Sequence, residues 1–301
     1  MKHSLFRKVL SLALCLIMVF SVMPLTAGAA AIEYTSSNFI YSIENGKATV
    51  IGSTFPSDYE GFAAIVSPLV YNNEEYQVTS IGYDSIDGNF TYLFFYGDIE
   101  RIEDNAMRNS DVTKSLYISD SITYIGDKAF GNSRVAWFGV DGKNPVYYSN
   151  NGYLYKRDGT LMVAPKTEEA CVIDDGTKTI KSMAFHNFFG PSVTIPASVT
   201  TIAYETFESC SSLTNVTFPE NSQLTTIGTD AFWDSGLASI TIPANVTTIG
   251  TDAFRYCDNL TSVIIPDNSQ LTTIGFASFL GCSALTSITL PAGLTSLDMA
   301  A

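Results

Sequence analysis

Hydrophobic positions recur along this chain at a nearly fixed interval. One aliphatic residue, which we call the anchor, returns every 21 to 25 residues, with a single longer interval after Ile125. Two core residues usually follow the anchor at the fourth and fifth positions, as in Ala231-Phe232 and Ala253-Phe254. A repeat of this length predicts a solenoid, in which each unit packs only against its neighbours. The anchors are Ile81, Ile102, Ile125, Ile180, Ile202, Ile227, Ile249, Ile274 and Leu297.

The pattern inside one unit predicts short strands. Apolar and polar residues alternate in Ser239–Ile242 and again in Ser287–Leu290, which is typical of a half-buried strand. Proline follows Ile242 and ends that strand, because it cannot continue a hydrogen-bonded ladder. The Gly-Thr-Asp stretch before Ala253 supplies capping side chains. Each unit therefore reads as a strand, a turn, a second extended piece and a short helical or irregular segment.

Segments outside the regular repeat divide the chain further. Residues 1–30 combine basic residues, an apolar run and Ala27-Gly28-Ala29, which indicates a secretory signal peptide. Residues 31–78 are expected to form a β-rich N-terminal cap, and residues 79–301 the solenoid. An insertion at about 131–178 contains Asn151-Gly152 and Asp158-Gly159, which predict the two turns of a three-strand meander. The last repeat is incomplete, since it stops one position before the expected phenylalanine.

The repeat pattern I-P-x-x-V-T-x-I-G-x-x-A-F-x-x-C, as in residues 242–257, resembles a known family over residues 79–301. This is the BspA-like, or Treponema pallidum type, family of bacterial surface leucine-rich repeats. The resemblance implies a secreted or cell-surface protein without catalysis that binds an extracellular protein or glycoprotein, such as host matrix, through its extended sheet. The alternative is a structural spacer within a larger surface protein.

Charge excludes several classes of partner. The chain has a net charge of −14, and removal of the signal would leave it near −17. From Met183 onward, Arg255 is the only lysine or arginine against nine acidic residues. Nucleic-acid binding needs a basic face, so a nucleic-acid partner is not expected, and anionic lipid surfaces are disfavoured for the same reason. No membrane insertion is expected after signal cleavage.

Candidate chemistry is sparse. No Cys/His cluster, calcium-loop spacing, phosphate loop or nucleophile motif occurs, so we expect no cofactor, no metal and no catalytic residues. Cys210, Cys257 and Cys282 each follow a core phenylalanine by three positions, which favours small buried side chains stacked from unit to unit. A Cys257–Cys282 disulfide is the alternative, although a helical segment there would hold the two Cα atoms too far apart.

Aromatic residues concentrate in the N-terminal half, where 14 of the 16 tyrosines precede Lys156. In each strand the residue between the two core positions should point outward, and exposed aromatic side chains are favoured contacts for protein or sugar partners. The alternative is that many of these rings fill the cores of the cap and the hairpins. The candidate binding residues are Tyr92, Phe94, Tyr96, Tyr117, Trp137, Tyr147 and Tyr148.

Overall fold

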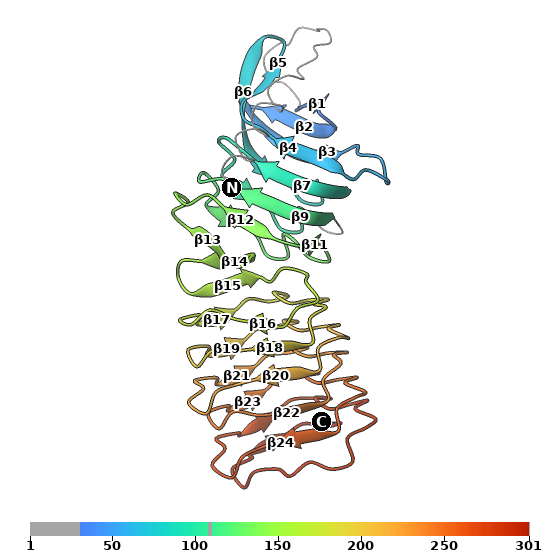
Figure 1. Cartoon of the computed structure of the whole chain (residues 1–301), viewed down its shortest axis with the longest axis vertical. Coiled ribbons are helices and arrows are strands. Elements are labelled where there is room, and N and C mark those ends of the chain that lie inside the picture. Colours follow the sequence, from blue (N-terminus) through green and yellow to red (C-terminus); the bar gives the residue numbers. More distant parts are fainter. Residues whose placement is uncertain (1–30, 108–109, 301) are drawn as a thin grey trace.

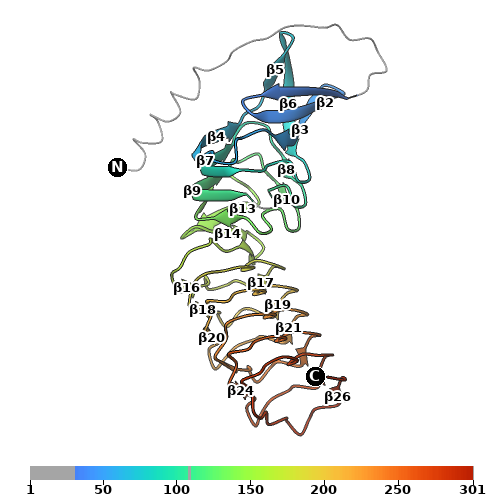
Figure 2. The same cartoon turned by 90° about the vertical axis from the view of Figure 1, so that its right-hand side faces the viewer.

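A computed structural model describes residues 31–107 and 110–300 as an elongated β-solenoid (Figure 1). The predicted signal peptide, 1–30, lies outside the described residues. The N-terminal strands stand at one end of the stack and the last rungs at the other (Figure 2). Within the described part of the chain the regular structure is all strand, with no helix and hence none that could cross a membrane.

One long face of the solenoid is built from the anchors. Each anchor is the last residue of a strand, and these strands pair in parallel from rung to rung, except between Ile125 and Ile180, where the insertion intervenes. The repeat register expected from the sequence is therefore confirmed. The strands are β6 (Glu74–Ile81), β8 (Arg101–Ile102), β10 (Tyr124–Ile125), β17 (Thr179–Ile180), β19 (Thr201–Ile202), β21 (Thr226–Ile227), β23 (Thr248–Ile249), β25 (Thr273–Ile274) and β26 (Ser296–Leu297).

A second face carries the alternating strands. In the last two of these strands the central residues Ile240 and Val263 point inward, while Thr241 and Ile264 face solvent. The strands on this face are β4 (Gly61–Ile65), β7 (Asn89–Phe95), β9 (Asp111–Ile118), β11 (Arg134–Val135), β12 (Phe138–Val140), β16 (Cys171–Val172), β18 (Ser192–Thr194), β20 (Asn215–Thr217), β22 (Ser239–Thr241) and β24 (Ser262–Ile264).

The segment after each anchor is a chain of turns. Left-handed backbone interrupts it twice per rung, at Asp230 (φ 52°) and Asp234 (φ 53°) in one rung and at Asp252 and Tyr256 in the next. A right-handed helix cannot continue through such residues. The turns nevertheless stack, because the amide of Phe232 donates to the carbonyl of Ala253 at 2.7 Å in the following rung. Of the two forms allowed by the sequence, this segment takes the irregular one.

Columns of identical side chains hold the rungs together. Phe185, Phe207, Phe232, Phe254 and Phe279 stack with ring centroids 4.8–5.2 Å apart, and four of these rings are fully buried. A second column consists of the first threonine of each Thr-Thr-Ile triplet, whose hydroxyl donates to a carbonyl of the preceding rung at 3.1–3.3 Å. Each rung therefore contributes both apolar contact and directed hydrogen bonds to the next.

The N-terminal end is a curled antiparallel sheet. Strands β1 (Ile32–Ser36), β2 (Phe39–Glu44) and β3 (Lys47–Ser53) are sequential hairpin neighbours, with Asn45-Gly46 as the left-handed turn between the last two. Strand β3 then pairs in parallel with β6, so this sheet leads directly into the first rungs. Strand β5 (Leu69–Tyr71) forms a further hairpin with β6.

The insertion contains an antiparallel meander that separates two hydrophobic cores. Its strands are β13 (Tyr147–Asn150), β14 (Tyr153–Lys156) and β15 (Thr160–Val163), and β15 continues in parallel into β17. Side chains of β14 alternate between the cores, since Tyr153 and Tyr155 join the C-terminal one and Leu154 joins the N-terminal one. Strand β14 is thus buried on both faces, and β13 and β14 lie between the N-terminal strands and the later rungs (Figure 2).

Candidate ligand-binding surface

Four parallel strands present an aromatic surface on the outer side of the N-terminal half. Strands β4, β7, β9 and β12 lie side by side (Figure 1), and their inward residues, including Leu93 and Leu116, are fully buried. Because successive side chains of a strand point to opposite faces, the intervening residues are directed outward. We call Phe62, Tyr92, Phe94, Tyr96 and Tyr117 the aromatic surface.

Strand register brings these rings together. Phe62 pairs with Tyr92, and Phe94 pairs with Tyr117 on the next strand. Phe94 lies at the centre, with its ring centroid 5.1 Å from that of Phe62, 5.4 Å from Tyr96 and 5.8 Å from Tyr117. Neighbouring rings on adjacent strands at such distances attract one another, which holds the cluster in one arrangement.

Exposure differs across the cluster. Phe94 is only 7% exposed, because the surrounding rings cover it, whereas Tyr92 is 38% and Phe62 is 36% exposed. Tyr96 and Tyr117 are half-buried. Phe94 is therefore the floor of the surface, and the tyrosines and Phe62 are the residues that a ligand would touch. Phe62 was not among the residues singled out from the sequence, because Gly61–Ile65 is apolar throughout and does not indicate which side chains point outward.

A polar group stands beside the rings. The Tyr117 hydroxyl donates to Asp141 Oδ2 at 2.7 Å. The pKa of Asp141 is held below its usual range, first by the Lys143 amide and then by this hydroxyl. Burial raises the pKa of Tyr96 to about 12, and burial and then the hydrogen bond to Asp141 raise the pKa of Tyr117 still further. Both phenols are consequently neutral at physiological pH, and the surface pairs apolar ring area with a fixed carboxylate.

Small residues flank the central row of rings. Ala64 pairs with Phe94 on one side, and Gly139 pairs with Tyr117 on the other. A Cβ atom at Gly139 would lie 3.5 Å from the Tyr117 ring, so that ring extends over the glycine. The row Ala64–Phe94–Tyr117–Gly139 therefore ends in a small residue on each side. A ligand can approach it there without meeting a large side chain.

The other predicted residues lie in the insertion, outside the ring cluster. Trp137 is 46% exposed and immediately precedes β12, where its ring covers Gly152. Tyr148 is half-buried and stacks on Tyr155 at 5.1 Å. Tyr147 is buried, and its hydroxyl accepts the amide of Ile125, so this residue fills the core of the meander. One cluster thus contains Tyr92, Phe94, Tyr96 and Tyr117. The three residues of the insertion lie outside it.

Toward the C-terminus the same face becomes a column of threonines. Thr194 pairs with Thr217, and Thr241 pairs with Ile264, all of them exposed. No ring contact is found among the outward residues of these strands in the described chain. Aromatic area on this face is therefore confined to its N-terminal half, as the distribution of tyrosines suggested.

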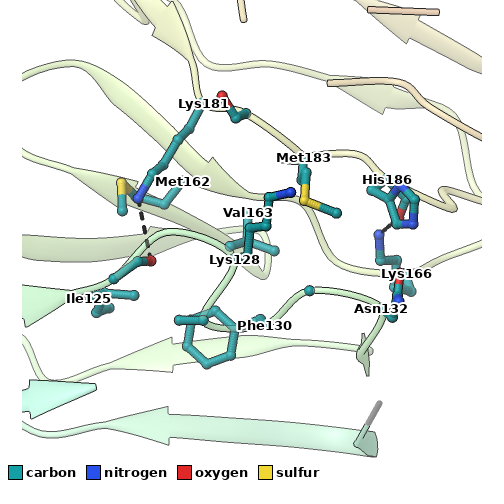
Figure 3. Close-up of a pocket in the computed structure, with 14 residues that line it drawn as sticks. Ile125, Lys128, Phe130, Asn132, Met162, Val163, Lys166, Lys181, Met183 and His186 are labelled. Atoms are coloured by element: carbon teal, nitrogen blue, oxygen red, sulfur yellow. Dashed lines mark hydrogen bonds between the residues drawn. The ribbon is translucent and has the colours of Figure 1, made fainter. Parts of the chain in front are cut away.

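A small cavity lies where the two halves of the solenoid meet (Figure 3). Its volume is about 30 Å³, room for about one water molecule. The lysines around it already have partners: Lys128 pairs with Glu205 at 3.2 Å, Lys181 with Asp127 at 2.8 Å, and Lys166 donates to the carbonyl of His186. Burial lowers the pKa of Lys166 to about 8. These contacts tie the halves together across the meander and leave little space for a ligand.

Metal-ligating side chains do not cluster elsewhere in the described residues. No group of three or more metal-ligating side chains occurs there. His186 lies with Nδ1 3.3 Å from Glu208, while Cys171 is buried in β16 next to Tyr153. The ring cluster of β4, β7 and β9 is accordingly the candidate site.

Solved structures share this fold at low sequence identity. A leucine-rich cell-surface protein of Faecalibacterium prausnitzii aligns over 86% of this chain and 95% of its own, with 17% identity and a TM-score of 0.55. The pneumococcal vaccine antigen PcpA aligns over 90% of this chain and 89% of its own, with 14% identity and a TM-score of 0.54. A leucine-rich repeat protein of Eubacterium ventriosum aligns over 89% of this chain and 93% of its own, with 19% identity and a TM-score of 0.51.

No curated protein sequence matches the chain. Six copies of the repeat described as the BspA type leucine-rich repeat region match it, over residues 70–139 and 178–301. These copies begin within the N-terminal sheet and resume after the meander, following the rungs. The stacked strands and the repeat match agree, and the chain belongs to the BspA type leucine-rich repeat family.

Proposed function

We propose that this chain is a bacterial cell-surface protein that mediates adhesion, without catalysis, by binding an extracellular protein or glycoprotein through the outer face of β4, β7, β9 and β12. The supporting observation is the aromatic surface itself. Tyr92 and Phe62 are exposed next to one another on paired strands, whereas β18, β20 and β22 carry threonine on that face. Aromatic residues held in place lose little entropy on binding, which favours them as contact residues.

A cell-surface location is consistent with the fold neighbours. One of the structures sharing the fold is described as a leucine-rich cell-surface protein and another as a vaccine antigen. We extend that location to this chain, together with export by the predicted signal peptide. Its acidic charge fits a partner reached outside the cell that is neither nucleic acid nor anionic lipid.

The competing function is that of a structural spacer within a larger surface protein. The observation that favours it is the uniformity of the C-terminal rungs, where β18, β20 and β22 present nearly the same exposed threonines. A spacer has no need of exposed rings on β4 and β7, which is why we prefer adhesion.

The test is binding of the purified chain to a panel of matrix glycoproteins, to the same glycoproteins after enzymatic removal of their glycans, and to free glycans. The Tyr92→Ser/Tyr117→Ser variant removes the ring contacts of β7 and β9. Loss of one dominant aromatic contact costs about 2 kcal/mol or more, so affinity should fall by roughly 30-fold or more. Tyr83→Ser, at an exposed tyrosine outside this face, is the matched control and should bind normally.

Each outcome has a definite meaning once circular dichroism shows that the variants are folded. Saturable binding lost only in the double variant supports adhesion at this surface. Binding that survives Tyr92→Ser/Tyr117→Ser means that the binding site does not lie on β7 and β9. Absence of binding across the whole panel favours the spacer.

A further inference from the structure

A column of small side chains runs through the core at the third position after each core residue. These side chains donate to the carbonyl of the core residue one rung earlier: Ser110 to Ile86 at 2.7 Å and Cys210 to Phe185 at 3.1 Å. Ser133 donates in the same way to Met107. Serine and cysteine are therefore interchangeable here as buried donors. The remaining members are Ser235, Cys257 and Cys282.

Two cysteines are consecutive in this column. Cys257 Sγ donates to the Phe232 carbonyl at 3.1 Å, and Cys282 Sγ donates to the Phe254 carbonyl at 3.0 Å. The Cys257 amide donates to that same Phe254 carbonyl at 3.2 Å, so Cys282 Sγ shares an acceptor with the backbone of Cys257. Cys257 and Cys282 therefore occupy equivalent positions on consecutive rungs of this column. One rung earlier the equivalent pair, Ser235 Oγ and Cys257 Sγ, is 3.2 Å apart.

The backbone holds these neighbours at a distance that suits a covalent link. The turns of the two rungs are joined just before the cysteines by Tyr256 N to Leu280 O at 2.9 Å, and just after them by Ser283 Oγ to Asp258 O at 3.4 Å. Hydrogen-bonded chains run about 4.8 Å apart, and disulfides span Cα separations of roughly 4.4–6.8 Å. The objection raised from the sequence, that a helical segment would separate the two cysteines, does not apply, because the described rungs contain no helix.

We propose that Cys257 and Cys282 form a disulfide between consecutive rungs when the chain meets a disulfide-bearing oxidant. Cys282 is 8% exposed and Cys257 is fully buried, so Cys282 reacts first. Its thiol loses a proton and attacks one sulfur of the oxidant, releasing one thiolate. The Cys257 thiol then loses its proton and attacks Cys282 Sγ, releasing the second thiolate. In total, two protein thiols and one disulfide yield one protein disulfide and two small thiols.

The electrostatics of the pair favour this order of events. Interaction with the Cys257 side chain lowers the pKa of Cys282, whereas interaction with Cys282, followed by burial, raises the pKa of Cys257. A lower pKa makes Cys282 the attacking thiolate. Cys210 has no such neighbour, since Phe188 and Ser235 occupy the adjacent positions of its column, and Cys171 lies in β16.

The experiment treats the folded full chain with oxidised glutathione near pH 8, denatures it under acid quench and alkylates the remaining thiols. Proteolysis at Asp258 and Asp267 separates the two cysteines for mass spectrometry. We expect a linked Cys257–Cys282 peptide and alkylated Cys171 and Cys210. Cys282→Ser should abolish the linked peptide and leave Cys257 alkylated, because serine keeps the donor to Phe254 but not the sulfur. Cys210→Ser is the matched control and should retain the link.

Two results would overturn the proposal. One is a folded, oxidised chain in which both Cys257 and Cys282 are alkylated. The other is glutathione held on Cys282 with Cys257 still free, since this would mean that the second sulfur cannot reach the first. As a second readout, a reducing agent should lower the unfolding midpoint of the oxidised wild-type chain and leave that of Cys282→Ser unchanged.

Discussion

At the scale of single residues, the repeat selects side chains by what the neighbouring rung offers them. Phenylalanine fills one column because identical rings stack, and threonine fills another because its hydroxyl reaches a carbonyl one rung earlier. These choices are visible in the sequence as anchors and Ala-Phe pairs. The burial of Phe94 and Tyr147 could not be read from the sequence, because it depends on contacts with residues from other strands.

Stacking also brings like charges together. Asp230 lies in the turn column, close to the charges of Asp252 and Glu205 on neighbouring rungs. Burial, followed by Asp252 and Glu205, raises the pKa of Asp230 to about 6. The folded state thus binds this proton more tightly than the unfolded chain does. For this group, stability is greatest below the ordinary carboxyl pKa of about 4 and falls as the pH rises from about 4 through 6.

Asp230→Asn should therefore stabilise the protein at pH 7.5 and lose that advantage at pH 4, where the folded-state aspartate is protonated. Urea unfolding midpoints at the two pH values measure the difference. Asp234→Asn is the control for the effect of placing asparagine in left-handed backbone, because the φ of Asp234, 53°, matches the 52° of Asp230. An advantage of equal size at both pH values would contradict the charge argument.

At the scale of elements, each rung is two short strands joined by turns, and the turns depend on close approach between rungs. Gly228, Gly250 and Gly275 follow consecutive anchors, and each lies against the backbone of the preceding rung. The Thr-Ile-Gly motif was readable as a repeat marker. The reason for the glycine could not be read from the sequence, because the backbone atoms that exclude a side chain belong to a residue about 22 positions away.

Gly250→Ala should destabilise the solenoid. The added Cβ would lie 2.6 Å from the amide nitrogen of Thr229 and 2.7 Å from the carbonyl carbon of Gly228, so the rungs would have to separate. We expect a cost of about 1–3 kcal/mol in the free energy of unfolding, measured by urea denaturation. Gly142→Ala is the matched control, because a Cβ atom there would meet nothing within 4 Å beyond its chain neighbours. Equal stability of the two variants would refute the close-packing explanation.

At the scale of the whole molecule, the meander divides the solenoid into two cores. Tyr155 and Leu161 belong to the C-terminal core, while Leu154 and Met162 belong to the N-terminal one. In a solenoid, stability is close to a sum of terms between neighbouring units. A destabilising substitution in one core should therefore loosen the neighbouring rungs of that core and have less effect beyond the β13–β15 layer.

Phe232→Ala tests this expectation. Phe232 is fully buried between Phe207 and Phe254, with ring centroids 5.0 and 5.1 Å away, so its truncation should cost about 3–5 kcal/mol. Hydrogen exchange should rise in the rungs from β19 to β25 and change little in β7 and β9. Phe276→Ala, at a phenylalanine that is 47% exposed, is the control and should have a small effect. Equal loss of protection in both halves would mean that the chain unfolds as one unit.

The sequence by itself determined the solenoid, its register, the position of the meander and the excess of aromatic residues in the N-terminal half. These follow from local periodicity, since every rung repeats the same short-range pattern. Tertiary structure alone decided which rings are exposed, that Phe62 and Asp141 join Tyr92 and Tyr117, and that Cys282 shares the Phe254 carbonyl with the backbone of Cys257. Those properties depend on stacking between rungs, which places side chains more than 20 residues apart within contact distance.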